Sequence, residues 1–256
     1  MNAYKSFLDL VFPKDIYCIS CGRPLPQQMG CEALPLCDRC MEGIDWVKGR
    51  RRIYEEEHAY GSAIACAVYS GLSAEMVRDM KYRGRSWNAS TLAALMAARY
   101  FAEADPDTGE LPFYDYIVHV PMYTAKKLFR GFDQAELLAA EVARRIGAPH
   151  LKKALTRVRK TETMSGLSGD ERRGNLVGAF AVSCDIMNLL AGTRLLLTDD
   201  VYTTGSSVSA CSEALIAAGA ECVDVLVFAV GKDERYGEDR PAVVESPGQL
   251  QAKGST

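Results

Sequence analysis

The sequence has no apolar run long enough to cross a membrane, and its net charge of −3 over 256 residues is close to neutral. The first absence removes any reason to expect a membrane partner. The second gives the chain no general electrostatic attraction to nucleic acid or to an acidic membrane surface. The signatures GxxxxGK(S/T) and GxGxxG are also missing, which excludes a P-loop and a dinucleotide-binding loop.

A secretory signal is absent as well, because residues 1–12 predict a short amphipathic helix instead. Nine cysteines in a chain without such a signal favour reduced thiols and metal binding over disulfides, so we expect a cytoplasmic protein. Apolar residues make up 48% of the chain, which is enough for a sizeable core. The length fits one large or two small domains.

Four of the cysteines form two CxxC pairs, Cys18–Cys21 and Cys37–Cys40, with the spacing of a four-cysteine zinc site. Each pair can offer two thiolates from a tight turn, and two such turns close a tetrahedron. The segment is rich in proline and glycine and has no core of its own, so it needs a metal to hold it. We predict a structural Zn²⁺ site here; unmetallated thiols or a redox CxxC are the alternatives. Cys31 is expected to be a spectator.

The most informative stretch is residues 195–207, where an apolar run meets two acids and then a turn rich in hydroxyls and glycine. Residues 194–201 predict a buried parallel strand, residues 207–219 a helix and residues 223–230 a second strand. This order is the crossover of a parallel sheet, and it places the turn at the carboxyl end of a strand, where open α/β sheets bind ligands.

The residue types in this turn suit a sugar phosphate. The acids Asp199 and Asp200 can hold sugar hydroxyls, and the helix N-terminus adds partial positive charge worth about 0.3–1 kcal/mol. Phosphate would be bound by a cradle of small residues in which glycine permits close approach: Thr203, Thr204, Gly205, Ser206 and Ser207. The alternative is a strand end with two solvated acids and a helix cap.

Periodicity predicts further elements on either side of this unit. Strands are expected at 63–69, 116–120, 153–158 and 177–182, and helices at 72–82, 90–104 and 134–146. We therefore divide the chain into an N-terminal helix and cysteine segment (1–50), an α/β domain with a parallel sheet flanked by helices (51–232) and a polar tail expected to be disordered (233–256).

The stretch 195–207 resembles the phosphoribosyl-pyrophosphate (PRPP) motif of type I phosphoribosyltransferases, which has an apolar strand, two acids and a T-T-G-S/T turn. The resemblance implies that Asp199 and Asp200 hold the ribose 2′- and 3′-hydroxyls. It also implies that residues 203–207 bind the 5′-phosphate.

Other motifs, taken in order, resemble the ComF family, in which a zinc ribbon precedes a phosphoribosyltransferase domain. They are the two CxxC pairs and residues 80–84, 120–121, 130–139, 159–161 and 167–175. Two residues depart from the family pattern: Asp133 stands where Asn is usual, and Met164 where Gln is frequent.

The resemblance implies a pyrophosphate-binding loop that starts at Pro121. Met122, Tyr123 and Thr124 would supply backbone N–H groups, and Lys126, Lys127 and Arg130 would supply positive charge. The alternative is a surface loop with a basic rim. Residues 157–175 resemble a flexible loop that closes over the site and excludes water; its members include Arg159, Thr161 and Arg172. The alternative is a disordered connection.

Two cations, Lys81 and Arg83, come at the end of a predicted helix. They are candidates to bind the ligand, and the alternative is that they only stabilise the helix end, where positive charge is favourable. His119 is the one histidine of three expected near the proposed site, and its structural reading stays open.

The resemblance implies a Mg²⁺-dependent phosphoribosyltransferase, in which pyrophosphate leaves ribose C1; the sequence does not reveal the acceptor. A non-catalytic PRPP-binding protein is the second hypothesis. The third is an accessory factor in DNA uptake, with single-stranded DNA or a competence protein as partner at the cysteine segment and at basic clusters such as residues 48–52. The sequence leaves open whether the chain forms a homodimer.

Overall fold

The computed structural model describes residues 17–25, 34–49, 52–54, 58–159, 176 and 178–231. The expected helix at 1–12, Cys31, Met164 and the tail from residue 233 lie outside the described residues. Within the described ranges no helix is long and apolar enough to cross a membrane.

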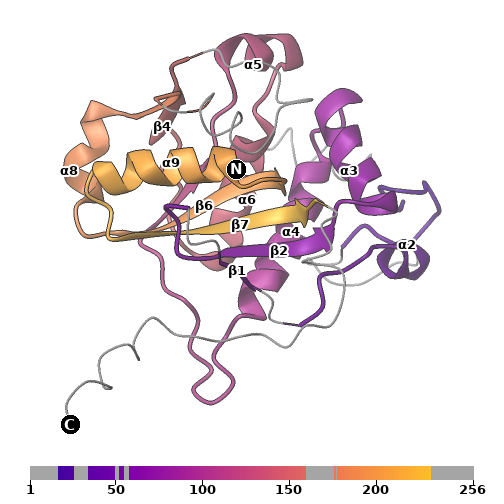
Figure 1. The fold of residues 1–256 in the computed structure, drawn as a ribbon. Helices are drawn as coiled ribbons and strands as arrows, with labels where there is room; N and C mark the ends of the chain where they lie inside the picture. The colour runs from indigo at the N-terminus through magenta and orange to yellow at the C-terminus, as the bar shows by residue number, and fades with distance from the viewer. Residues whose placement is uncertain are drawn as a thin grey trace, which may run out of the picture.

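A five-stranded sheet forms the centre of the molecule, with strand order β1-β2-β7-β6-β3 (Figure 1). Its strands are β1 (Arg52–Ile53), β2 (Ala63–Val68), β3 (Tyr116–His119), β6 (Arg194–Tyr202) and β7 (Cys222–Val230). β1 is antiparallel to β2, and the other neighbours are parallel. The central strands are continuous apolar runs because helices cover both faces of a parallel sheet.

Seven α-helices are described around this sheet. They are α2 (Asp38–Glu42), α3 (Gly71–Tyr82), α4 (Asn88–Phe101), α5 (Thr124–Arg130), α6 (Gln134–Ile146), α8 (Met187–Leu190) and α9 (Ser206–Ala217). A short 3₁₀ turn, Cys184–Ile186, precedes α8, and a second antiparallel ribbon pairs β4 (Leu155–Arg157) with β5 (Phe180–Val182).

Alternating side chains divide the core into two layers, one on each face of the sheet. Ile64 and Cys66 of β2 join the core under α3, α4 and α6, whereas Ala63 and Ala65 join the core under α9 and the β4–β5 ribbon. Figure 1 shows α9 crossing one face of the sheet with α4 and α6 behind it. The result is a three-layer α/β fold, as the sequence predicts.

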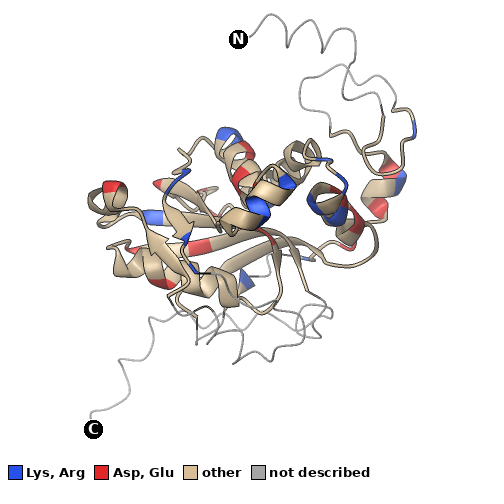
Figure 2. Ribbon diagram, turned by 90° about the horizontal axis from the view of Figure 1, so that it is seen from above, with Lys and Arg blue, Asp and Glu red and all other residues tan. Residues whose placement is uncertain are grey.

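The structure differs from the expected elements mainly after β3, where residues 124–130 form helix α5 instead of a loop. No sequence pattern indicates this helix, because seven residues with no buried side chain form no apolar stripe. Figure 2, seen from above Figure 1, shows blue and red segments interspersed over the described helices. That mixture agrees with the small net charge.

Candidate functional site

Two segments far apart in the sequence leave the same edge of the sheet. β3 runs parallel to β6, with His119 opposite Thr198, and the N–H of Val120 donates to the carbonyl oxygen of Thr198 at 3.0 Å. The segment after β3 and the loop after β6 therefore start as neighbours. This is the edge at which parallel α/β sheets bind ligands.

The loop after β6 surrounds a pocket of about 80 Å³, lined by Asp199, Val201 and residues 202–208. That volume suits a phosphate group better than a whole nucleotide, since sites enclosing small molecules span about 300–1,000 Å³. Gly205 has φ +73° and directly precedes α9, and the Oγ1 of Thr204 lies 2.9 Å from the Oγ of Ser206. The loop thus presents hydroxyls and a helix N-terminus to one small space.

Two aromatic rings pack against this loop, one from the motif itself (Tyr202) and one from a distant part of the chain (His58). A Cβ built on Gly205 would lie 2.5 Å from the Oη of Tyr202 and 2.6 Å from the Cε1 of His58. His58 Nδ1 lies 2.8 Å from the Oη of Tyr60, which lies 2.6 Å from the Oη of Tyr202. Sequence reasoning missed His58, and no motif could have found it, because only the fold brings it to residue 205.

The acid pair lies beside the pocket and is withdrawn from water. Asp200 is 3% exposed, and its Oδ1 accepts a hydrogen bond from the Nζ of Lys81 at 2.6 Å. Its Oδ2 is buried and has no hydrogen-bond partner among the described residues. Asp199 Oδ1 accepts the N–H of Asp200 at 2.8 Å. One buried acceptor therefore remains for a donor from outside the chain.

Burial and neighbouring charge set the electrostatics of this pair. Burial, reinforced by the charge of Asp200, raises the pKa of Asp199 well above its usual range. Burial, the largest single influence, would lower the pKa of Lys81, but the charge and hydrogen bond of Asp200 and the charge of Asp199 together outweigh burial and raise that pKa. Lys81 therefore stays positively charged, and it lies beside the carboxyl groups of Asp200 and Asp199 where little water reaches it.

The segment after β3 has most of its polar groups already engaged within the chain. The N–H of Met122 donates to Asp133 Oδ2 at 2.9 Å, and Lys127 Nζ lies 2.6 Å from Glu136 Oε2. Arg130 donates to Gln134 at 2.6 Å. Pro121 is buried, Tyr123 directly precedes α5, and Thr124 and Lys126 are exposed. A ligand could contact Lys126 directly, whereas it would have to displace Asp133, Glu136 or Gln134 to bind Met122, Lys127 or Arg130.

Asp133 has a structural role that its sequence position did not reveal. One carboxylate oxygen caps α6 by accepting the N–H groups of Ala135 and Glu136, at 3.1 and 3.3 Å, while the other accepts the N–H of Met122. Asparagine could form the cap but has only one acceptor oxygen. The acid therefore ties the segment after β3 to the start of α6.

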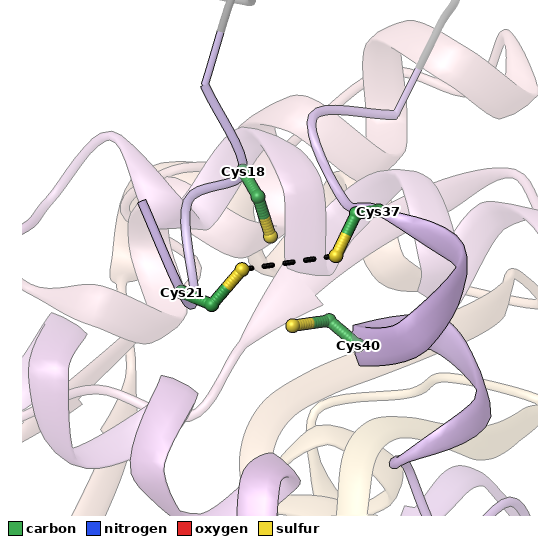
Figure 3. Close-up of side chains that lie close together, drawn as sticks. All are labelled: Cys18, Cys21, Cys37 and Cys40. Atoms are coloured by element: carbon green, nitrogen blue, oxygen red, sulfur yellow. Dashed lines mark hydrogen bonds between the residues drawn. The ribbon is translucent and has the colours of Figure 1, made fainter. Parts of the chain in front are cut away.

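The four predicted zinc ligands come together (Figure 3). The sulfur atoms of Cys18, Cys21, Cys37 and Cys40 lie within 4.8 Å of one another, and Cys21 and Cys37 are 3.7 Å apart. A tetrahedral zinc with Zn–S bonds of about 2.3 Å places its sulfurs about 3.8 Å apart, so this donor set fits the ion. Figure 3 shows one pair on a turn and the other on α2, with the sulfurs pointing to a common centre.

The thiols differ in their ionisation. Burial opposes ionisation of Cys18, but N–H groups near its sulfur outweigh burial and lower its pKa to about 6. Burial raises the pKa of Cys40 to about 12. A zinc ion would hold all four sulfurs as thiolates by its own charge.

The cysteine segment is attached to the end of β2 and the start of α3. Val47 N–H donates to the carbonyl of Cys66 at 2.9 Å, and Val68 N–H donates to the carbonyl of Asp45 at 2.7 Å. Cys18 and Cys40 belong to the same buried cluster as residues 76, 77 and 80 of α3. The cysteine cluster and the core are therefore one packed unit.

Sequence comparison gives the relatives of this chain. The DNA utilization protein YhgH of Salmonella typhi is 31% identical over 81% of this chain and 81% of its own length, and that of Escherichia coli K12 is 30% identical over the same shares. Competence protein F of Haemophilus influenzae is 28% identical over 85% of this chain and 91% of its own length. The chain belongs to the ComF family. No protein-family model matches it.

Solved structures similar to this ComF-family chain include phosphoribosyl enzymes. The glutamine PRPP amidotransferase of B. subtilis overlaps 54% of this chain at 19% identity and a TM-score of 0.34, and this chain spans 25% of it. The adenine phosphoribosyl transferase of Trypanosoma brucei overlaps 90% of both chains at 12% identity and a TM-score of 0.31. The strand order and the β6–α9–β7 crossover show the α/β fold with a parallel sheet flanked by helices that the sequence predicts.

His119, the histidine expected near the site, is paired with another histidine. Its Nδ1 lies 3.1 Å from the Nε2 of His150, and burial lowers the pKa of both rings to about 4. His119, Asp133 and Glu136 have potential ligand atoms within 4.8 Å of one another, but Lys127 and Lys152 already bond Glu136, each at 2.6 Å. The cluster is satisfied internally, which favours the structural reading of His119.

The predicted flexible loop is described only at its base, where β4 and β5 form its two sides. Arg159 is exposed just beyond β4, while Thr161 and Arg172 lie outside the described residues. Arg157 of β4 has its guanidinium 5.5 Å from the ring centre of Phe180, and burial lowers its pKa.

Proposed function

We propose that this ComF-family protein binds the magnesium complex of PRPP at the carboxyl edge of its sheet and transfers the phosphoribosyl group to an acceptor. The observation that carries the proposal is the pair Asp199–Asp200, in which Asp200 is buried and Asp199 lines the anion-sized pocket of residues 202–208. An acid pair with an unused buried oxygen suits sugar hydroxyls, and the adjacent hydroxyl-lined pocket suits a phosphate.

Each part of the ligand then has a place. The unpartnered Oδ2 of Asp200 accepts a ribose hydroxyl, and Asp199 takes the neighbouring one. Residues 203–207 bind the 5′-phosphate. The segment after β3 lies next to both, so its exposed Lys126 and the cations beyond it meet the pyrophosphate.

The reaction would break the bond between ribose C1 and a pyrophosphate oxygen, form a bond between C1 and the acceptor, and release the acceptor's proton. Magnesium arrives with the substrate and supplies charge neutralisation of the leaving pyrophosphate. The chain itself orients the sugar by its hydroxyls and keeps negative charge near the positive charge that develops at C1. This chemistry needs no histidine or cysteine nucleophile.

Isothermal titration with magnesium–PRPP tests the binding site. Wild type should bind, and the double variant Asp199→Asn/Asp200→Asn should lose at least about 100-fold in affinity, because two charge-assisted hydrogen bonds are weakened. Asp107→Asn, at an exposed acid outside the site, is the matched control. Equal binding by wild type and the double variant would show that the acids do not hold the ribose.

Pyrophosphate release across a panel of nucleobases separates a transferase from a binding protein. A transferase releases pyrophosphate in proportion to one acceptor and stops in the double variant. Tight PRPP binding without acceptor-dependent release would support the non-catalytic alternative.

We also propose that Cys18, Cys21, Cys37 and Cys40 hold a structural zinc ion, supported by their mutual distances. Metal analysis of the reduced protein should find one zinc per chain. Cys37→Ser, or a chelator, should remove the ion and lower the unfolding temperature, because the cysteine segment shares its core with α3. Cys184→Ser, at an exposed cysteine elsewhere, is the control. Purified reduced protein without zinc would reject the site.

A second function, binding of single-stranded DNA during DNA uptake, is supported by the names of the relatives and by one surface of this chain. Exposed aromatic rings and cations lie together at the ends of α3 and α5: Tyr82, Arg83, Lys126, Phe129 and Arg130. Phe129 is 96% exposed, and the Arg130 guanidinium lies 5.1 Å from the ring centre of Tyr82. Such rings can stack on bases while the cations bind phosphates.

A salt-dependent shift assay with a single-stranded oligonucleotide tests this surface. The variant Phe129→Ala should weaken binding about 5- to 100-fold, because stacking contributes about 1–3 kcal/mol per base. Phe113→Ala, at another exposed phenylalanine, is the matched control. Equal effects of the two variants would contradict the assignment.

A further inference from the structure

Three cations lie close together in the sequence at the end of α3: Lys81, Arg83 and Arg85. Of these three, Lys81 bonds the acid pair. Arg83 and Arg85 both bond Asp79, at 2.8 and 2.7 Å. Lys81 turns the other way and reaches Asp200 Oδ1 at 2.6 Å. The side chains of Lys81 and Asp200 are 19% and 4% exposed, so this contact is largely removed from water.

We propose that Lys81 is a positioning residue that holds Asp200 in the orientation needed to bind the ribose hydroxyls. This inference rests on the proposed function of the acid pair. It assigns Lys81 a role through Asp200 and not through direct contact with pyrophosphate.

The geometry supports action through the carboxylate. Lys81 occupies one oxygen of Asp200 and leaves the other, Oδ2, buried and unpartnered among the described residues. Asp199 is fixed in turn, because its Oδ1 accepts the N–H of Asp200. One lysine therefore sets the direction of the free oxygen on one acid, and the backbone between the two acids fixes the other.

Charge supports the same role. Several groups act on the pair from different elements: Lys81 of α3, Asp133 at the start of α6, Arg157 of β4 and Cys211 of α9. Arg157 and Lys81 are the cations of this set, and only Lys81 bonds Asp200. Lys81 lowers the pKa of Asp199 against the effect of burial, so without Lys81 that acid would hold its proton more tightly.

The test compares two ligands that differ only in pyrophosphate. Lys81→Met should weaken binding of PRPP and of ribose 5-phosphate by the same factor, about 10- to 100-fold, because the lost interaction acts on the sugar. If Lys81 instead contacts pyrophosphate, PRPP will weaken and ribose 5-phosphate will not, and that result would overturn the proposal.

Two further measurements separate positioning from a general structural effect. In Lys81→Met the ribose 5-phosphate affinity should recover as pH rises, because loss of the lysine charge raises the pKa of Asp199 further and a higher pH ionises that acid, whereas misfolded protein would show no recovery. Lys81→Arg should retain most of the affinity because it keeps the charge. Arg85→Met, whose partner is Asp79, is the control and should bind like wild type.

The two proposals fail in different ways. Wild type that binds neither ligand rejects the proposed function itself. Wild type that binds both ligands, together with a folded Lys81→Met that binds them equally well, rejects only the role of Lys81. Circular dichroism and thermal unfolding establish that each variant is folded before its affinity is compared.

Discussion

The loop after β6 and the segment after β3 leave neighbouring strands at one edge of the sheet, but they are built on opposite plans. In the β6 loop, small residues surround an open pocket whose shape is set by tight packing against aromatic rings. In the β3 segment, Met122, Lys127 and Arg130 already bond groups of the same chain. The phosphate half of the proposed site is thus preformed, whereas the pyrophosphate half must exchange partners when it binds.

The largest effect on stability and binding is expected when a side chain is added at Gly205 in the β6 loop. Gly205→Ala should lower the free energy of unfolding by about 2–4 kcal/mol and abolish ribose 5-phosphate binding, because strain at φ +73° adds to overlap with Tyr202 and His58. Gly192→Ala has a similar φ, +69°, with no atom near the new carbon, and isolates the strain alone. Equal costs at both positions would mean that the rings simply move aside and that the loop is not tightly preformed.

An intermediate effect on stability is expected at Asp133, which holds the segment after β3 through the N–H of Met122. Asp133→Asn keeps the cap of α6 but turns the acceptor of the Met122 N–H into a donor, so stability should fall by about 1–3 kcal/mol. Hydrogen exchange at the Met122 amide should become faster, and denaturant unfolding gives the free energy. Unchanged exchange at Met122 would show that the segment is held by something other than Asp133.

The smallest effect is expected at the two neighbouring lysines of α5. Lys126→Ala should weaken PRPP binding about 2- to 5-fold, as for an exposed charge contact, and leave ribose 5-phosphate binding unchanged. Lys127→Ala should do less, because Lys127 is already bonded to Glu136. Titrations at low and high salt measure both, and a larger effect at Lys127 would show that it leaves Glu136 for the ligand.

Sequence reasoning predicted long, strongly patterned elements well. The helix 134–146 has the expected bounds because its apolar stripe is clear, Asp133 caps its start and Gly147 ends it in the left-handed conformation. β6, α9 and β7 follow the predicted strand–loop–helix–strand unit within two residues. Their patterns reflect burial on both faces of a sheet, which a sequence records directly.

Other features were missed because they depend on contacts between distant residues. Arg83 pairs with Asp79 at the local i,i+4 spacing, but no local pattern links Lys81 to Asp200. His58 belongs to no recognisable sequence motif, and only the fold brings it against Gly205. Asp133 looked like a departure from a family motif and proved to tie two segments together.

The sequence by itself determined the chemistry available to this protein: four thiols in zinc spacing, and an acid pair followed by a turn of hydroxyls and glycine. These are local patterns, fixed by residue type and spacing along a few turns of chain. The tertiary structure alone decided which cation faces the acids, which oxygen stays unpartnered and which groups near the site are already engaged. Those outcomes depend on how helices and loops from separate parts of the chain compete for the same buried polar atoms, and that competition is settled only when the chain is folded.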